Sequence, residues 1–395
     1  MTKPLEGIRV IDLTRVLAGP FCTMLLADMG AEVIKVENPK GGDDSRAFGP
    51  FKNGLSAYYM GLNRSKRSVT LNLKEPRAKE ILKNLVAKAD VIVENYKPGT
   101  MDKLGLGYAV LKEINPKIIY AASSGFGQTG PYSSKAAYDL IVQGMSGFMS
   151  ITGFDAKHPV KSGSSIADIF AGVFTAIGIL SALQYRNKTG RGQMVDVAML
   201  DCMVAILENA IASYDSTGKA PEPIGNVHRS IAPFATFNTA DGFINVCAGN
   251  DDLWRRFCEV VGLEEYIEDP RYVDNKSRVE NFSELEKLIN DRMTTQTTDA
   301  WREVLDAVKV PCGPIMNVAQ VAVDPQVKAR DMIVELMHPL AGKLLVPGTP
   351  IKFSETPAAI SCPAPELGEH TAEVFGDLLG IDEKEIETLR KNGVI

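Results

Sequence analysis

The feature that most constrains this chain is a long uncharged stretch that directly follows an acidic residue. Residues 169–183 carry no charged side chain, and Asp168 stands immediately before them. A helix that is apolar all round is normally buried, so the stretch predicts a core helix. A carboxylate at the edge of a core costs free energy unless its charge is paired or used. Asp168 is therefore either the N-cap of this helix or a functional group.

Short apolar segments alternate with helical patterns along the first half of the chain. Runs rich in β-branched residues predict buried strands at 7–14, 32–37, 67–73, 90–95 and 117–124. Helices are expected at 20–29, 75–89 and 138–148. Strands and helices that alternate with short connections predict an α/β fold with a parallel, doubly wound, Rossmann-like sheet.

The pattern changes after residue 193. A strand at 194–200 leads into a helix that we expect to run to about Tyr214, and residues 235–249 predict a hairpin that turns at Asp241-Gly242. Three further helices are expected at 251–262, 282–294 and 298–308, followed by a Pro/Gly connector at 309–316. This mixture predicts a second, smaller α+β domain.

Several classes of protein are disfavoured by what the sequence lacks. The six cysteines form no CxxC pair and the four histidines lie far apart, so we expect no metal site and a reducing, cytoplasmic compartment. No run of Lys or Arg exceeds two residues, which argues against nucleic-acid binding. The uncharged stretch is shorter than the ~20 residues of a membrane span, so no membrane contact is expected.

Basic residues cluster near the ends of the predicted strands, namely Arg15, Lys74, Lys97 and Lys103. Ligands of open α/β sheets bind outside the carboxyl ends of the strands, where several cations would suit a polyphosphate. There is no GxGxxG, GxSxG or Walker motif, so neither a dinucleotide site nor a serine nucleophile is indicated.

With these residues in view, the sequence resembles the class III CoA-transferases of the CaiB/BaiF type. The nucleophile segment is Ser165-Ile-Ala-Asp-Ile-Phe-Ala-Gly172. The other matching segments are 4–37, 63–74, 93–105, 120–131, 137–147, 188–193, 311–314 and 367–371, which together span nearly the whole chain. Segments 42–50, 225–228 and 248–251 resemble members that accept oxalate.

The resemblance implies that Asp168 attacks an acyl-CoA thioester and passes through anhydride and aspartyl-CoA intermediates. CoA would be a substrate, with no permanently bound cofactor. The positions that match the family's CoA site are Val16, Ala18, Leu71, Lys74, Asn95, Lys97, Lys103 and Tyr138. His228 or Arg229 would contact the acceptor. Acetyl-, succinyl- and formyl-CoA remain open as donors.

Three positions depart from the formyl-CoA:oxalate members of the family. Leu17 stands where those enzymes carry Gln, Asn38 where they carry Arg, and Ala136 where they carry Lys. These departures argue against formyl-CoA as the donor.

The family fold implies an interlocked, ring-like homodimer with a divided large domain. Residues 1–200 would form its N-terminal part, which binds CoA and carries the nucleophile, and 326–395 would complete it. Residues 226–305 would form the small domain, joined through 201–225 and 306–325.

Two other functions remain open at this point. A 2-methylacyl-CoA racemase of the same fold needs two acid–base groups, and the second is a histidine where this chain has Tyr138. A non-catalytic acyl-CoA binding protein would need no nucleophile, so an acid at a costly position such as Asp168 argues against it.

Overall fold

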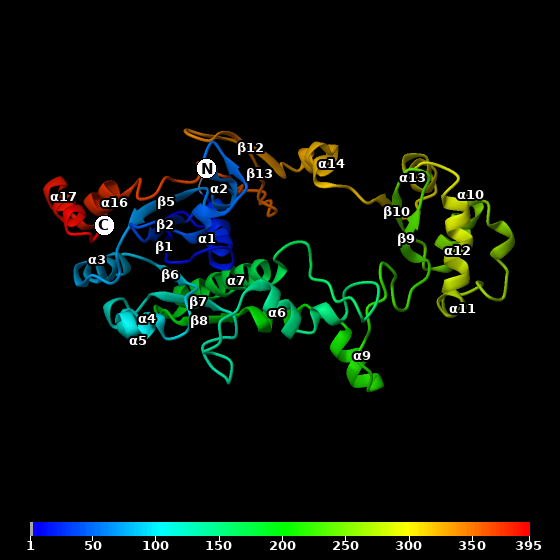
Figure 1. Ribbon diagram of the computed structural model, residues 1–395, viewed down its shortest axis with the longest axis horizontal. Coiled ribbons are helices and arrows are strands. Elements are labelled where there is room, and N and C mark those ends of the chain that lie inside the picture. The colour runs from blue at the N-terminus through cyan, green and yellow to red at the C-terminus, as the bar shows by residue number, and fades with distance from the viewer. Residues whose placement is uncertain (1–2) are drawn as a thin grey trace. The chain divides into compact units, whose positions relative to one another are not determined.

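The computed structural model describes residues 3–395, which divide into two compact units (Figure 1). The first unit contains the described residues up to Met149, then 161–220 and 325–395. The second contains 150–160 and 221–324, and so is longer than the 226–305 expected for the small domain. The chain thus leaves the first unit and returns to it.

A parallel sheet of six strands forms the centre of the first unit. In spatial order the strands are β5 (Lys66–Thr70), β2 (Glu32–Glu37), β1 (Arg9–Asp12), β6 (Val91–Glu94), β7 (Ile119–Ser124) and β8 (Met194–Ala198). Strand order reverses between β1 and β6, which is where doubly wound sheets bind their ligands. The predicted α/β fold class is confirmed.

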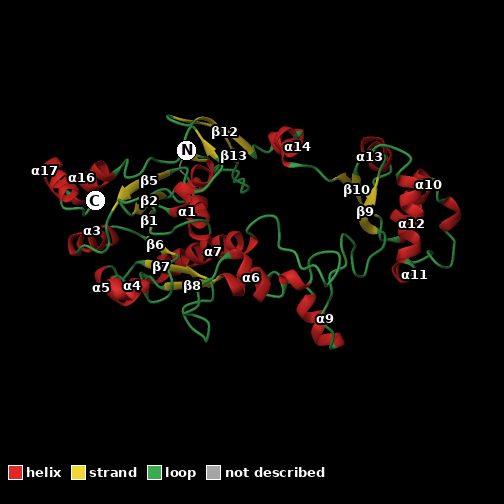
Figure 2. Ribbon diagram, in the orientation of Figure 1, coloured by secondary structure: helices red, strands yellow, loops and turns green. Residues whose placement is uncertain are grey.

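Helices cover both faces of this sheet (Figure 2). On one face, strand residues such as Val10 and Val33 pack with α1 (Ala18–Asp28) and α7 (Ile166–Thr189). On the other face, Ile11 and Ile34 pack with α3 (Pro76–Val86), α5 (Tyr108–Ile114), α16 (Thr371–Leu379) and α17 (Glu383–Lys391). Burial on both faces explains why strands of the sheet contain consecutive apolar residues, such as Val33-Ile34 and Val91-Ile92-Val93.

The uncharged stretch lies in α7, which continues to Thr189 and is long and apolar enough to cross a membrane. In the structure one face of this helix belongs to the core, because its Ala176, Ile179 and Ala182 pack against the sheet with α1. Gly172 allows the two helices to approach closely, since a Cβ there would lie 2.6 Å from the carbonyl oxygen of Ala18. This contact holds the N-terminal ends of α1 and α7 together.

The other elements of the first unit surround this centre. They are β3 (Phe51–Lys52), β4 (Leu55–Ser56), α2 (Ala57–Leu62), α4 (Thr100–Leu104), α6 (Asp139–Met145), α8 (Met199–Ala205), α9 (Ala210–Thr217), α15 (Pro325–Ala329), β12 (Ile333–His338) and β13 (Gly342–Pro347). The long helix expected up to Tyr214 is instead the pair α8 and α9. They are separated at Glu208, whose φ of 55° is incompatible with a continuous helix.

The second unit has its own antiparallel sheet and core. The predicted hairpin is confirmed as β9 (Phe234–Asn238) and β10 (Phe243–Cys247). The expected connector at 309–316 instead contains a short strand, β11 (Cys312–Pro314), because it pairs with β10. The helices are α10 (Asp251–Val261), α11 (Asn275–Glu280), α12 (Phe282–Met293), α13 (Thr298–Ala307) and α14 (Val318–Val323).

Candidate active site

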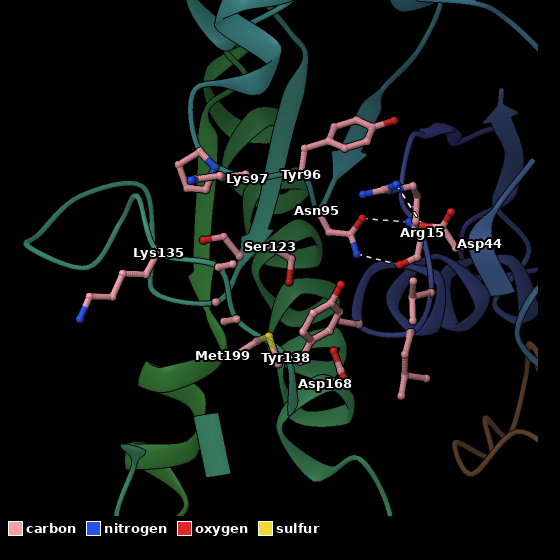
Figure 3. Close-up of a pocket in the computed structure, with 18 residues that line it drawn as sticks. Arg15, Asp44, Asn95, Tyr96, Lys97, Ser123, Lys135, Tyr138, Asp168 and Met199 are labelled. Atoms are coloured by element: carbon pink, nitrogen blue, oxygen red, sulfur yellow. Dashed lines mark hydrogen bonds and ion pairs between the residues drawn. The ribbon is translucent and has the colours of Figure 1, made fainter. Parts of the chain in front are cut away.

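A pocket opens in the first unit at the carboxyl ends of β1, β6 and β7, beside the N-termini of α1, α6 and α7 (Figure 3). This is the point where the strand order reverses. Its lining consists of Arg15, Val16, Leu17, Ala18, Asp44, Asn95, Tyr96, Lys97, Pro98, Ser123, Ser124, Gly125, Lys135, Ala136, Ala137, Tyr138, Asp168 and Met199.

Asp168 lies in the first turn of α7 but does not cap it. The N-cap is Ser165, and no side chain caps the helix from that position, so the N-cap interpretation of Asp168 is wrong. The side chain of Asp168 has no hydrogen-bond partner among residues 3–395 and faces the pocket. A half-buried carboxylate without a partner is poorly stabilised, as a nucleophile requires.

The capping role belongs to Asp139, a buried residue at the start of α6 that was not among the predicted site residues. Its Oδ1 accepts the backbone N–H of Ala167 at 3.0 Å, and its Oδ2 accepts the side-chain amide of Gln143 at 2.7 Å. The side-chain oxygen Oε1 of Gln143 in turn accepts the backbone N–H of Ser162 at 2.9 Å. The only sequence signal was an acid and an amide four residues apart at the start of a helix.

The electrostatic environment of Asp168 favours its protonated form. Burial, and secondarily the negative charge of Asp139, raise its pKa to about 7. Near neutral pH the residue is thus a mixture of acid and carboxylate, and the carboxylate is more basic than an exposed one. Burial and the charge of Asp168 also raise the pKa of Tyr58 to about 12, so this phenol remains protonated.

The turn between β1 and α1 forms one wall of the pocket and is held from two sides. Val16 has a φ of 67°, which is strained for a β-branched residue. The Asn95 carboxamide accepts the backbone N–H of Arg15 at 2.9 Å and donates to its carbonyl at 2.8 Å. Asp43 accepts the N–H of Val16 at 3.0 Å and pairs with the fully buried Lys35 at 2.8 Å. These contacts keep the strained turn in place.

The pocket brings together six of the predicted site residues. Its lining contains Val16, Ala18, Asn95, Lys97, Tyr138 and Asp168. The side-chain amide of Asn95, however, is already bonded to Arg15. Leu71, Lys74 and Lys103 lie outside this lining, where Leu71 packs in the core and the two lysines are exposed.

His228 and Arg229 belong to the second unit. The half-buried ring of His228 lies 5.3 Å from the ring of Phe234 and lines a separate open hollow. The exposed guanidinium of Arg229 donates to the carbonyl of Glu222. Within residues 3–395, no group of three or more His, Cys, Asp or Glu side chains could hold a metal ion.

Comparison with known sequences places this chain in a known family. The chain matches CoA-transferase family III over residues 5–371. The chain belongs to this family. It is 41% identical to the human succinyl-CoA:glutarate CoA-transferase, covering 100% of this chain and 90% of the relative. It is 44% identical to the acetyl-CoA:oxalate CoA-transferase of Acetobacter aceti, covering 93% and 94%.

A solved structure shows the same fold. The crystal structure of a CaiB/BaiF family protein from Brucella suis aligns with a TM-score of 0.87 and 40% identity, over 96% of this chain and all of the other. Membership makes the protein a CoA-transferase that uses CoA thioesters as substrates. The two relatives are named for different carboxylic acids, so membership does not identify the acceptor.

Proposed function

We propose that this enzyme moves CoA from an acyl-CoA to a small dicarboxylic acid, with Asp168 as the covalent nucleophile. The observation that carries the proposal is the position of Asp168 in the pocket: it has no hydrogen-bond partner within residues 3–395, and its pKa is raised to about 7. Its carboxylate form is therefore basic and available for attack on a carbonyl.

The reaction would proceed through two anhydrides at Asp168, with an aspartyl-CoA thioester between them. The carboxylate attacks the thioester carbon, the C–S bond breaks, and an acyl–aspartyl anhydride forms as CoA thiolate leaves. The thiolate attacks the aspartyl carbonyl and expels the donor acid, which leaves an aspartyl-CoA thioester. The acceptor carboxylate attacks that thioester to give a second anhydride and thiolate. The thiolate then attacks the acceptor's acyl carbon, which releases the new acyl-CoA and restores Asp168. No net proton is taken up.

Residues around the pocket suit the two ends of such a substrate. Lys97 and Lys135 are exposed, and in Figure 3 Lys135 extends away from Asp168. These cations would attract the phosphates of CoA. Tyr138 lies next to Asp168 in the same view and is 75% exposed, which suits contact with the pantetheine arm. Lys74 and Lys103 would act as further phosphate contacts.

The choice of acids follows from the pocket and from the named relatives. Oxalate is the first acceptor that we expect, and glutarate, named for the human relative, is the second. Leu17 and Ala136 give the pocket apolar side chains at positions where the formyl-CoA:oxalate members of the family carry Gln and Lys. Acetyl- or succinyl-CoA is therefore the preferred donor. None of the residues that line the pocket is a histidine, which argues against the two-base chemistry of a racemase.

We also propose that the enzyme is a cytoplasmic, interlocked homodimer. All six cysteines are free, which fits a reducing compartment. Large apolar side chains are exposed on helices of the first unit, including Leu140, Ile141, Ile177 and Ile211, and a partner chain would cover them. Sedimentation should give a mass near twice 42.8 kDa, and a monomer would contradict the dimer.

Arg229 and His228 remain proposed acceptor contacts, so His228→Ala should raise the acceptor KM.

A panel of substrates tests the proposed activity. Acetyl-, succinyl- and formyl-CoA are each paired with oxalate, glutarate and malate, and kcat/KM is measured for every pair. We expect at least one dicarboxylate to be a good acceptor, with neighbouring chain lengths differing by about 10- to 200-fold. Failure of all three dicarboxylates as acceptors with every donor would contradict the proposed substrate class.

A further inference from the structure

Ser123 presents an unsatisfied hydroxyl to the pocket. It is the fifth residue of β7, is 2% exposed, and contributes to the pocket lining. Its Oγ has no hydrogen-bond partner among residues 3–395. The neighbouring Ser124 differs, because its Oγ accepts the backbone N–H of Gly127 at 3.0 Å. Ser124 therefore has a structural role, whereas the Ser123 hydroxyl has none among the residues that the structure describes.

The direction of Ser123 follows from the alternation of side chains along β7. Ile119 and Ala121 pack on the face that α7 covers, while Tyr120 and Ala122 pack on the opposite face. Because alternate residues of a strand share a face, Ser123 lies on the α7 side of the sheet. Figure 3 shows it between Asn95 and Tyr138, on the inner side of the pocket that also contains Asp168.

A buried hydroxyl without a partner is unusual in a folded protein, since most buried polar groups are hydrogen-bonded. Leaving one unsatisfied destabilises the folded state. The unbonded Ser123 hydroxyl therefore does not stabilise the fold. We expect its hydrogen-bond partner to come from a bound molecule. The pocket lining supplies no other explanation, because the nearby amide of Asn95 is already bonded to Arg15.

We propose that the Ser123 hydroxyl donates a hydrogen bond to a carbonyl or carboxylate oxygen of the acyl group held beside Asp168. This assignment rests on the proposed function. The phosphates of CoA are expected near the exposed Lys97 and Lys135, whereas the acyl end must reach Asp168. A buried donor on the α7 face is therefore placed for the acyl group, and Ser123 contributes to acyl and acceptor selectivity.

The test is the variant Ser123→Ala, assayed for CoA transfer, for binding of free CoA by calorimetry, and for thermal unfolding. Transfer kcat/KM should fall about five- to thirtyfold through loss of one hydrogen bond. The Kd of free CoA should not change, and Tm should be equal or higher because an unsatisfied group is removed. Ser124→Ala should instead lower Tm, since the Gly127 N–H loses its acceptor.

Three results would count against these claims, and they can be told apart. Unchanged kcat/KM in Ser123→Ala, with an active wild-type enzyme, would overturn the role of Ser123 alone. A loss of free-CoA affinity as large as the loss of kcat/KM would show that Ser123 binds CoA, which overturns the acyl assignment. A wild-type enzyme that transfers no CoA would overturn the proposed function and the role of Ser123 with it.

Discussion

Asp139 caps the helix that carries Asp168, and its charge adds to burial in raising the pKa of Asp168 to about 7. One acidic residue thus fixes the start of α7 through the N–H of Ala167 and makes the neighbouring carboxylate more basic. The two acids have different roles because one is hydrogen-bonded and the other, within residues 3–395, is not.

Replacing Asp139 with asparagine should move the pH profile of the reaction. In the wild-type enzyme kcat/KM should rise with pH through about 7, because only the carboxylate form of Asp168 attacks. Asp139→Asn removes a negative charge while keeping an oxygen that can accept the Ala167 N–H, so the midpoint should move to lower pH. The shift should be smaller than the one that burial causes, since burial is the larger effect. A midpoint that stays in place or moves to higher pH would contradict this coupling.

Replacing Asp168 with asparagine should stabilise the protein in a pH-dependent manner. The folded pKa of Asp168 lies above its ordinary value of 3.8, so the folded state binds a proton more tightly than the unfolded state. The stability that protonation gives is complete at low pH and is lost as pH rises through about 7. Urea unfolding should therefore show Asp168→Asn to be more stable than wild type at pH 8, with little difference at pH 4. Transfer activity should fall by at least about a thousandfold. If Asp168→Asn and wild type had the same free energy of unfolding at pH 4 and at pH 8, the pKa of Asp168 would not be raised in the folded state.

Removing the carboxamide of Asn95 should affect both stability and substrate binding. Asn95→Ala breaks two hydrogen bonds to the Arg15 backbone and frees the strained turn at Val16. We expect a loss of about 1–3 kcal/mol in unfolding free energy and a severalfold rise in KM for acyl-CoA.

A matched control is Asn115→Ala. The Asn115 carboxamide donates to the carbonyls of Val86 and Ala89, away from the pocket. Asn115→Ala should lower the free energy of unfolding by a similar amount and leave the KM for acyl-CoA unchanged. An equal change of KM in both variants would show that the Asn95 effect is not local to the pocket.

Adding a methyl group between α1 and α7 should change the geometry of the pocket, because the N-terminal ends of both helices line it. In Gly172→Ala the new Cβ would lie 2.6 Å from the Ala18 carbonyl oxygen and 3.2 Å from the Phe21 Cβ, so the helices must separate. We expect a loss of about 1–3 kcal/mol in stability. We also expect a lower kcat, because Ala18 and Asp168 line the same pocket.

Gly61→Ala provides the control, because Gly61 is also helical but has nothing within 4 Å of its Cβ position. This variant should be neutral or slightly stabilising. If Gly172→Ala were as well tolerated as Gly61→Ala, the close contact would not set the geometry of the pocket.

The elements that the sequence predicted best are those fixed by local patterns. The run Val91-Ile92-Val93 is apolar because both faces of the sheet are buried, and Asp241-Gly242 turns a hairpin by its own conformational preference. The break at Glu208 and the pairing of Cys312–Pro314 with β10 were missed, because tertiary contacts decide them.

The sequence likewise predicted only part of the site. The apolar run after Asp168 marked this residue as either a cap or a functional group, and the family resemblance assigned it the role of nucleophile. The capping role of Asp139 and the unsatisfied hydroxyl of Ser123 depend on which segments lie side by side in the fold. A pattern of residues along the chain does not contain that information.

Covalent trapping tests the central claim most directly. The wild-type enzyme is incubated with acyl-CoA, treated with borohydride to reduce an aspartyl-CoA thioester to the alcohol, digested, and analysed by mass spectrometry. We expect reduction at Asp168 that depends on acyl-CoA and is absent from Asp168→Asn. An enzyme that turns over while Asp168 stays unmodified, or that is modified at Asp139 instead, would contradict it.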